Sequence, residues 1–401
     1  MTRPETAVRR ARMAVLGVFG LCGLICAVWS ASLPSINARL HLGEGRIGLV
    51  LLITALGSMA CMPVAGRLAD TWSSRAVLRV IAPVAALALL GPALAPSFPV
   101  LLAAAFVLGG ALGSLDVAMN GHAVEVETRY GRSIMSAFHG VWSLGGVAGG
   151  LTITVGLHLD TGGAALMVGA GLVAAVLFLL PGRHLLTGEA RQEVAGDPVV
   201  SAGGLPTSTI LLLGLVALAG FVSEGAGYSW ASLHAQGMLG ADPATASFAY
   251  TAFAAALTVS RLTADRIRSK VNPASWMRYA GSVAVLGYAL VLVAPLLPAG
   301  RLAFGLVGWV VVAAGLATVV PAIFSAVGAG GANVGRALSW VTTMAYAGQL
   351  GGPAVIGPLA DATSLGTAMV VPGLLAAVIA VAGPIVVRRA TARHLTTAGL
   401  E

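Results

Sequence analysis

The sequence predicts an all-α membrane protein with twelve transmembrane helices, arranged as two six-helix halves. Of the 401 residues, 57% are hydrophobic and only 9% are charged, whereas a soluble domain has about a quarter of its residues charged because its surface faces water. The chain also contains twelve apolar stretches of roughly the 20 residues that cross a hydrocarbon core. Finally, short motifs recur about half a chain apart. Helices are required because hydrocarbon offers no partners for backbone N–H and C=O groups.

The apolar stretches are continuous and do not alternate from residue to residue, as the strands of a membrane barrel would. The first six cover 13–33, 46–66, 77–96, 99–121, 133–157 and 163–181, and the second six cover 209–233, 244–263, 276–297, 301–323, 335–359 and 366–387. Cys22, Cys26 and Cys61 fall at membrane depth. They are interpreted as small apolar side chains, because no disulfide framework or metal-ligand spacing is present.

One long polar stretch separates six predicted helices from the other six. It predicts an N-terminal half over 1–183, a cytoplasmic linker over 184–207, a C-terminal half over 208–390 and a cytoplasmic tail over 391–401.

The basic residues predict the orientation of the chain. All but three of the 23 Lys and Arg residues lie in the tails and loops on the side that holds the N-terminus; the exceptions are Arg39, Arg46 and Arg301. The positive-inside rule then places both termini in the cytoplasm. The net charge of +8 is explained by topology, so no nucleic-acid partner is expected.

Two motifs relate the halves to each other. Gly66-Arg-Leu-Ala-Asp70 follows the second predicted helix, and Arg261-Leu-Thr-Ala-Asp265 follows the eighth. Leu144-Gly-Gly146 lies in the fifth, and Leu350-Gly-Gly352 in the eleventh. Internal repeats of this size are typical of secondary transporters, in which the solute binds between the repeats.

Gly66, Asp70 and Arg75 resemble the loop signature of the major facilitator superfamily (MFS), a Gly followed by an Asp and basic residues. Thr71 replaces the usual basic residue, and Ser73 replaces the usual glycine. The resemblance covers nearly the whole chain. It implies two halves related by pseudo-two-fold symmetry, a monomer, and alternating access controlled by a cytoplasmic gate. The gate would comprise the signature residues and their repeat counterparts Arg261 and Asp265.

Within that superfamily, four stretches resemble the fucose-permease-related branch of bacterial inner-membrane proteins. They are Leu115-Asp-Val-Ala-Met-Asn120, Met135-Ser-Ala-Phe-His-Gly140, Ser223-Glu-Gly-Ala226 and Val320-Pro-Ala-Ile-Phe-Ser325. The first predicted helix departs from fucose permease because it lacks an acidic residue.

Asp116 lies deep in the fourth predicted helix, where an ionisable group is costly and therefore suggests function. Gly109, Gly113, Asp116 and Asn120 recur at spacings of four, three and four, so they share one small, polar helix face. That face should point at other helices or a cavity. The fucose-permease resemblance implies proton coupling for Asp116 and solute contact for Asn120. The alternative is a buried acid bonded to a neighbouring helix.

Glu224 in the seventh predicted helix is the other deep carboxylate, and it could share the proton coupling. Tyr228 and Trp230 on the same helix are candidate solute contacts, although Trp230 could equally be an interface anchor. His139 is either a solute contact, a proton-relay member or a buried imidazole with a satisfied hydrogen bond. Pro321, Pro353 and Pro358 can kink their helices.

These features predict a secondary transporter of a small, sugar-like or otherwise polar solute, driven by a proton gradient without cofactor or metal. A proton-antiport exporter of a drug or natural product is the first alternative, and a solute sensor without net transport is the second. An enzyme is not expected, because no HExxH, GxSxG or Walker motif is present and the loops cannot hold a soluble catalytic domain.

Overall fold

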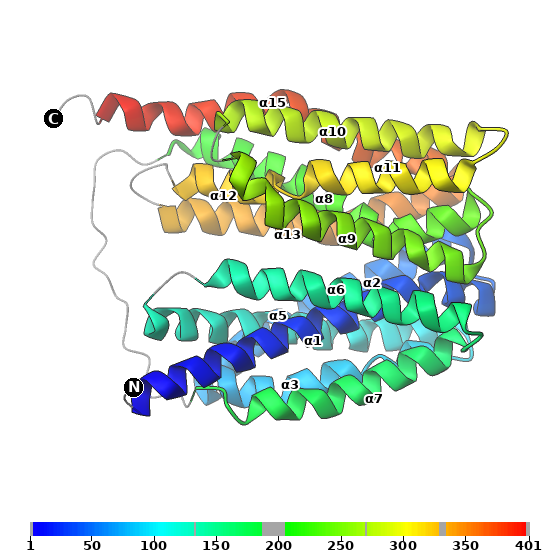
Figure 1. Ribbon diagram of the computed structural model, residues 1–401, viewed down its shortest axis with the longest axis horizontal. Coiled ribbons are helices and arrows are strands. Elements are labelled where there is room, and N and C mark those ends of the chain that lie inside the picture. Colours follow the sequence, from blue (N-terminus) through cyan, green and yellow to red (C-terminus); the bar gives the residue numbers. More distant parts are fainter. Residues whose placement is uncertain (1–2, 132–133, 187–204, 269–270, 329–333, 398–401) are drawn as a thin grey trace. The chain divides into compact units, whose positions relative to one another are not determined.

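The computed structural model describes residues 3–131, 134–186, 205–268, 271–328 and 334–397, and these residues form helices without any strand. They divide into two compact units (Figure 1). Unit 1 holds α1 (Arg3–Leu40), α2 (Gly43–Trp72), α3 (Ser74–Leu87), α4 (Leu90–Leu94), α5 (Phe98–Tyr130), α6 (Met135–His158), α7 (Gly163–Gly182) and the first half of α9 (Pro243–Arg268). Unit 2 holds α8 (Thr207–Gly237), the rest of α9, α10 (Pro273–Val293), η1 (Ala294–Leu296), α11 (Arg301–Leu316), α12 (Val319–Gly328), α13 (Val334–Ala362), α14 (Leu365–Ala368) and α15 (Val370–Thr397).

The predicted all-helical membrane fold is confirmed. Ten helical segments within the described residues are long and apolar enough to cross a membrane, and α9 and α13 are two further long helices that carry more polar residues. Each of the twelve predicted stretches corresponds to one of these segments. Several helices extend beyond the roughly 20 residues that a bilayer needs; α1 contains 38.

Three of the membrane segments consist of two α-helices in series, namely α3 with α4, α11 with α12, and α14 with α15, and a fourth continues from α10 into the short 3-10 helix η1. The break between α11 and α12 has a clear chemical cause. Pro321 has no N–H, so it cannot donate to the carbonyl of Ala317, four residues earlier, and the helix is interrupted at Ala317–Thr318. By contrast, α13 continues through Pro353 and Pro358.

The same helix pairs pack in both units. In unit 1, α1 packs against α6 and α7, and α3 packs against α5 and α7. In unit 2, the corresponding α8 packs against α13 and α15, and α10 packs against α11 and α15. The short sequence motifs that recur half a chain apart therefore belong to a repeated packing scheme.

Small residues permit the closest helix contacts. A Cβ atom added to Gly145 of α6 would overlap the carbonyl of Gly20 in α1, and one added to Gly109 of α5 would overlap the carbonyl of Thr54 in α2. Ser58 of α2 also donates a hydrogen bond of 2.7 Å to the Gly109 carbonyl. As predicted, the face of α5 that carries Gly109 and Gly113 points at a neighbouring helix.

Polar side chains secure the helix ends in unit 1. Glu127, near the end of α5, accepts hydrogen bonds from the N–H groups of Ile134 (2.8 Å) and Met135 (2.7 Å), where α6 begins. Asp242 accepts from the N–H groups of Ala244 and Thr245 at the start of α9. The Thr245 hydroxyl, together with these N–H groups, lowers the pKa of Asp242 below its ordinary value.

Candidate functional site

The deep carboxylate of unit 1 is held by its own helix. The side-chain amide of Asn120 donates to the Asp116 carbonyl (2.9 Å) and to Asp116 Oδ1 (3.1 Å). Both side chains are partly buried. The neutral amide can donate to Oδ1 both when Asp116 is ionised and when its second oxygen carries a proton. Asn120 can therefore orient Asp116 in either protonation state.

Helices α1 and α6 supply the surroundings of Asp116. The thiol of Cys22 in α1 lies within interaction range of the Asp116 carboxylate and of the Trp142 indole in α6. One turn before Trp142, His139 is exposed, and its ring stands edge-on to Phe19 with ring centroids 5.3 Å apart. The three helices thus bring an acid, an imidazole and aromatic rings into one region of unit 1.

The deep carboxylate of unit 2 forms an ion pair. Arg261 Nη2 in α9 lies 2.8 Å from Glu224 Oε1 in α8. The side chains keep 30% and 16% of their surface exposed, respectively. The guanidinium also interacts with the Tyr228 hydroxyl, one turn along α8. An ion pair with a phenol beside it offers both hydrogen-bond donors and acceptors to a small polar molecule.

The helix break at Pro321 helps to position Arg261. Arg261 Nε donates to the carbonyl of Ala317 at 3.3 Å, which is the carbonyl that lacks a helical donor because of Pro321. A proline in one helix thereby creates an acceptor that orients an arginine on another.

A buried network fixes α8 next to Glu224. The Tyr288 hydroxyl of α10 donates to the Ser223 carbonyl at 2.7 Å, and the Ser223 hydroxyl donates to the Pro372 carbonyl of α15 at 3.1 Å. Tyr288 and Ser223 are fully or almost fully buried. Hydrogen bonds of this kind keep the position of Glu224 defined by three helices.

Trp230 of α8 is shielded from solvent. The side chain is fully buried, and its indole N–H has no hydrogen-bond partner among the described residues. The sequence suggested a solute contact or an interface anchor at this position, and the observed burial resembles that of a core residue.

The predicted gate residues lie at helix ends. Gly66 and Asp70 occupy the last turns of α2, where Asp70 is exposed, and Arg75 lies in the first turn of α3. Arg261, which the repeat assigned to the gate, contacts Glu224, and its gate role stays a prediction. The side chain of Asp265 falls outside the described residues.

A further polar cluster, in unit 1, was not anticipated from the sequence. His122 of α5 is fully buried; its Nδ1 lies 2.7 Å from the Ser74 hydroxyl, and its Nε2 accepts from the N–H of Leu186 at 3.2 Å. The Ser74 hydroxyl donates to Glu125 at 2.9 Å. These contacts join α3, α5 and the chain after α7.

Comparisons with known proteins agree with this architecture. A family model described as Major Facilitator Superfamily matches residues 14–330. The transporter y4wD of Sinorhizobium fredii is 32% identical over 376 residues, which cover 92% of this chain and 96% of that protein. The membrane protein MosC of Rhizobium meliloti is 29% identical over 359 residues, covering 89% and 85%.

Solved structures with the same fold extend over almost the whole chain. A bacterial homologue of the human lysosomal transporter Spinster, in an inward-facing and unoccupied conformation, has a TM-score of 0.74 at 14% identity and covers 97% of this chain and 98% of its own. A D-xylose–proton symporter has a TM-score of 0.70 at 15% identity, covering 92% and 95%. None of these matches tests the fucose-permease branch, which stays a prediction. The family match, the relatives and the repeated helix packing establish that the chain belongs to the major facilitator superfamily and is a multi-pass membrane transporter of small solutes.

Proposed function

We propose that this transporter couples the movement of a small hydroxylated, sugar-like solute to a proton gradient by alternating access. Asp116 is the main proton carrier, and the Glu224–Arg261 pair contacts the solute. The observation that carries the proposal is the 2.8 Å ion pair between two membrane helices, formed by side chains that remain partly exposed.

The ion pair suits a solute with several hydroxyl groups. A guanidinium has five N–H donors and a carboxylate has about four acceptor positions, so one contact between them leaves capacity on each side. A charged group at this depth is expensive to maintain, which argues for a functional use. One of the solved structures with a similar fold is a D-xylose–proton symporter, which agrees with a sugar-like solute for this transporter.

The two carboxylates have different partners and are therefore assigned different tasks. Glu224 is held in its ion pair with Arg261, so it can share in proton transfer only when that pair opens. Asp116 receives a hydrogen bond from the neutral Asn120 amide. It can load and release a proton as alternating access changes its exposure, without first separating from that amide.

The coupling is tested with purified protein in proteoliposomes that carry an imposed pH gradient, using D-xylose and uridine as the first solutes in a panel. Asp116→Asn should abolish accumulation against a concentration gradient and retain solute exchange, because the side chain keeps its size but no longer titrates. Asp361→Asn, which changes an exposed acid at the end of α13, serves as the matched control and should behave like the parent protein.

Solute binding is measured separately by the thermal shift that the same compounds produce, since a ligand stabilises the state it binds. Arg261→Gln should remove the shift caused by the transported solute. Full proton-driven accumulation in the Asp116→Asn, Glu224→Gln double variant would refute the coupling assignment. An unchanged thermal shift in Arg261→Gln would refute the solute contact.

A further inference from the structure

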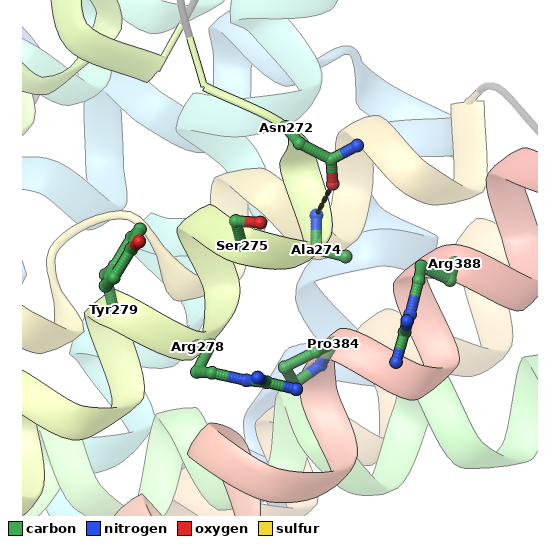
Figure 2. A pocket seen from close by; sticks show the side chains of 7 residues that line it. All are labelled: Asn272, Ala274, Ser275, Arg278, Tyr279, Pro384 and Arg388. Atoms are coloured by element: carbon green, nitrogen blue, oxygen red, sulfur yellow. Dashed lines mark hydrogen bonds between the residues drawn. The ribbon is translucent and has the colours of Figure 1, made fainter.

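A basic pocket opens at the end of unit 2 where α10 begins. It has a volume of about 300 Å³ and is lined by Asn272, Ala274, Ser275, Arg278 and Tyr279 on the α10 side and by Pro384 and Arg388 of α15. Figure 2 shows the side chains of Arg278 and Arg388 extending from their separate helices toward Pro384. The transport site described above uses none of these residues.

The two guanidinium groups have unused hydrogen-bonding capacity. Arg278 and Arg388 are exposed, and their guanidinium groups make no hydrogen bond or ion pair with any residue that the structure describes. Arginines bind phosphate groups through paired N–H donors. The Tyr279 side chain, 62% exposed, adds a hydroxyl donor at the same pocket.

The start of α10 adds positive potential. Asn272 Oδ1 accepts from the N–H of Ala274 at 2.9 Å, and Pro273 occupies the first position of the helix. The N-terminal end of a helix carries partial positive charge that favours a bound anion. The pocket therefore combines two full charges with one helix end.

Apolar stripes run from this pocket along both helices. On α15, Leu374, Val378, Val381 and Ile385 are 41–68% exposed and follow helical spacing to Arg388. On α10, Tyr279, Val283 and Leu286 form a similar exposed stripe. The helices also approach closely, since a Cβ atom on Gly281 would overlap the backbone of Ala380.

We infer that this pocket binds the phosphate of an anionic phospholipid, with its acyl chains lying along the exposed stripes of α10 and α15. A free phosphate would satisfy the arginines alone, whereas a lipid matches both the basic pocket and the adjoining apolar surface. Basic pockets between transmembrane helices are known to select anionic head groups in this way.

The test uses the full-length purified protein and measures retained lipid by native mass spectrometry after addition of phosphatidylglycerol or phosphatidylcholine. The Arg278→Gln, Arg388→Gln double variant should bind phosphatidylglycerol roughly thirtyfold more weakly, as expected from two basic contacts. The matched control is Arg79→Gln, Arg389→Gln, which removes two exposed arginines outside the pocket and should retain parental binding.

Further experiments distinguish lipid binding from the binding of a soluble anion and from a general effect of positive charge on the protein. Inorganic phosphate and sn-glycerol 3-phosphate, at the same concentration, should not compete with the lipid. The inference is overturned if either anion competes fully, if phosphatidylcholine binds as well as phosphatidylglycerol, or if the pocket and control variants lose binding equally. Circular dichroism and monodisperse elution confirm that each variant is folded.

Discussion

Ser73 carries a backbone conformation that side chains rarely adopt. It joins α2 to α3 with φ 102° and ψ 147°, a region that strongly favours glycine and costs on the order of 1–3 kcal/mol for other residues. The family signature has glycine at this position, so the serine found here introduces backbone strain that glycine would avoid. The Ser73 side chain offsets part of the cost by accepting from the N–H of Ala76 at 3.3 Å.

Ser73→Gly should therefore stabilise the protein, and a rise of about 2 °C in melting temperature is expected for a gain of about 1 kcal/mol in a unit of this size. Loss of the cap to glycine costs only a few tenths of a kcal/mol. Ser73→Ala is the control, because it loses the cap and retains the strain, and its melting temperature should fall. Equal melting temperatures for the two variants would contradict the assigned strain.

At the scale of single residues, the sequence identified the deep acids but not their partners. Asp116 and Glu224 stood out because charges are rare at membrane depth. Arg261 was assigned to the gate because Arg261-Leu-Thr-Ala-Asp265 repeats the Gly66-Arg-Leu-Ala-Asp70 motif half a chain earlier. Its contact with Glu224 depends on how α8, α9 and the α11–α12 break are packed, and local sequence carries no direct record of that packing.

At the scale of helices, the apolar stretches predicted the membrane segments well because length and hydropathy act locally. The interruptions were harder to predict. Pro321 does break its membrane segment, whereas α13 continues through Pro353 and Pro358. A proline need not end a membrane helix, because neighbouring groups can satisfy the backbone carbonyl that it leaves without a donor, so its effect depends on tertiary contacts.

Helix α6 provides a test of the close glycine contacts. Gly145→Ala should destabilise unit 1 by about 1–3 kcal/mol, because the new methyl group overlaps the Gly20 carbonyl and α1 must move away. The control is Gly140→Ala on the same helix, where a Cβ atom meets no neighbour within 4 Å. Gly140→Ala should be neutral or stabilising, since alanine favours the helix.

The measurement is thermal unfolding of each purified variant in one detergent. The contrast between the two positions is decisive, because both changes add the same methyl group to α6. If Gly145→Ala melts at or above the temperature of Gly140→Ala, then the α1–α6 contact is not as close as the structure indicates.

For the whole molecule, the distribution of arginine and lysine predicts a cytoplasmic location for both termini. Of the 23 basic residues, all but Arg39, Arg46 and Arg301 fall on the predicted side of the membrane that holds the N-terminus. The physical basis is that basic loops are retained on the cytoplasmic side during insertion. Helix positions alone cannot reveal this orientation, because a helix bundle can be inserted in either direction.

Cysteine accessibility in intact cells tests the orientation. In a background that lacks Cys22, Cys26 and Cys61, single cysteines at His184 and Arg389 should react with a membrane-impermeant maleimide only after the cells are opened. A cysteine at Thr161, in the exposed turn between α6 and α7, should react in intact cells and so controls for reagent activity. If position 184 or 389 is labelled in intact cells while position 161 is protected, the protein has the opposite orientation in the membrane. The basic pocket between α10 and α15 would then face the outer leaflet, and the phospholipid that it binds would have to come from that leaflet.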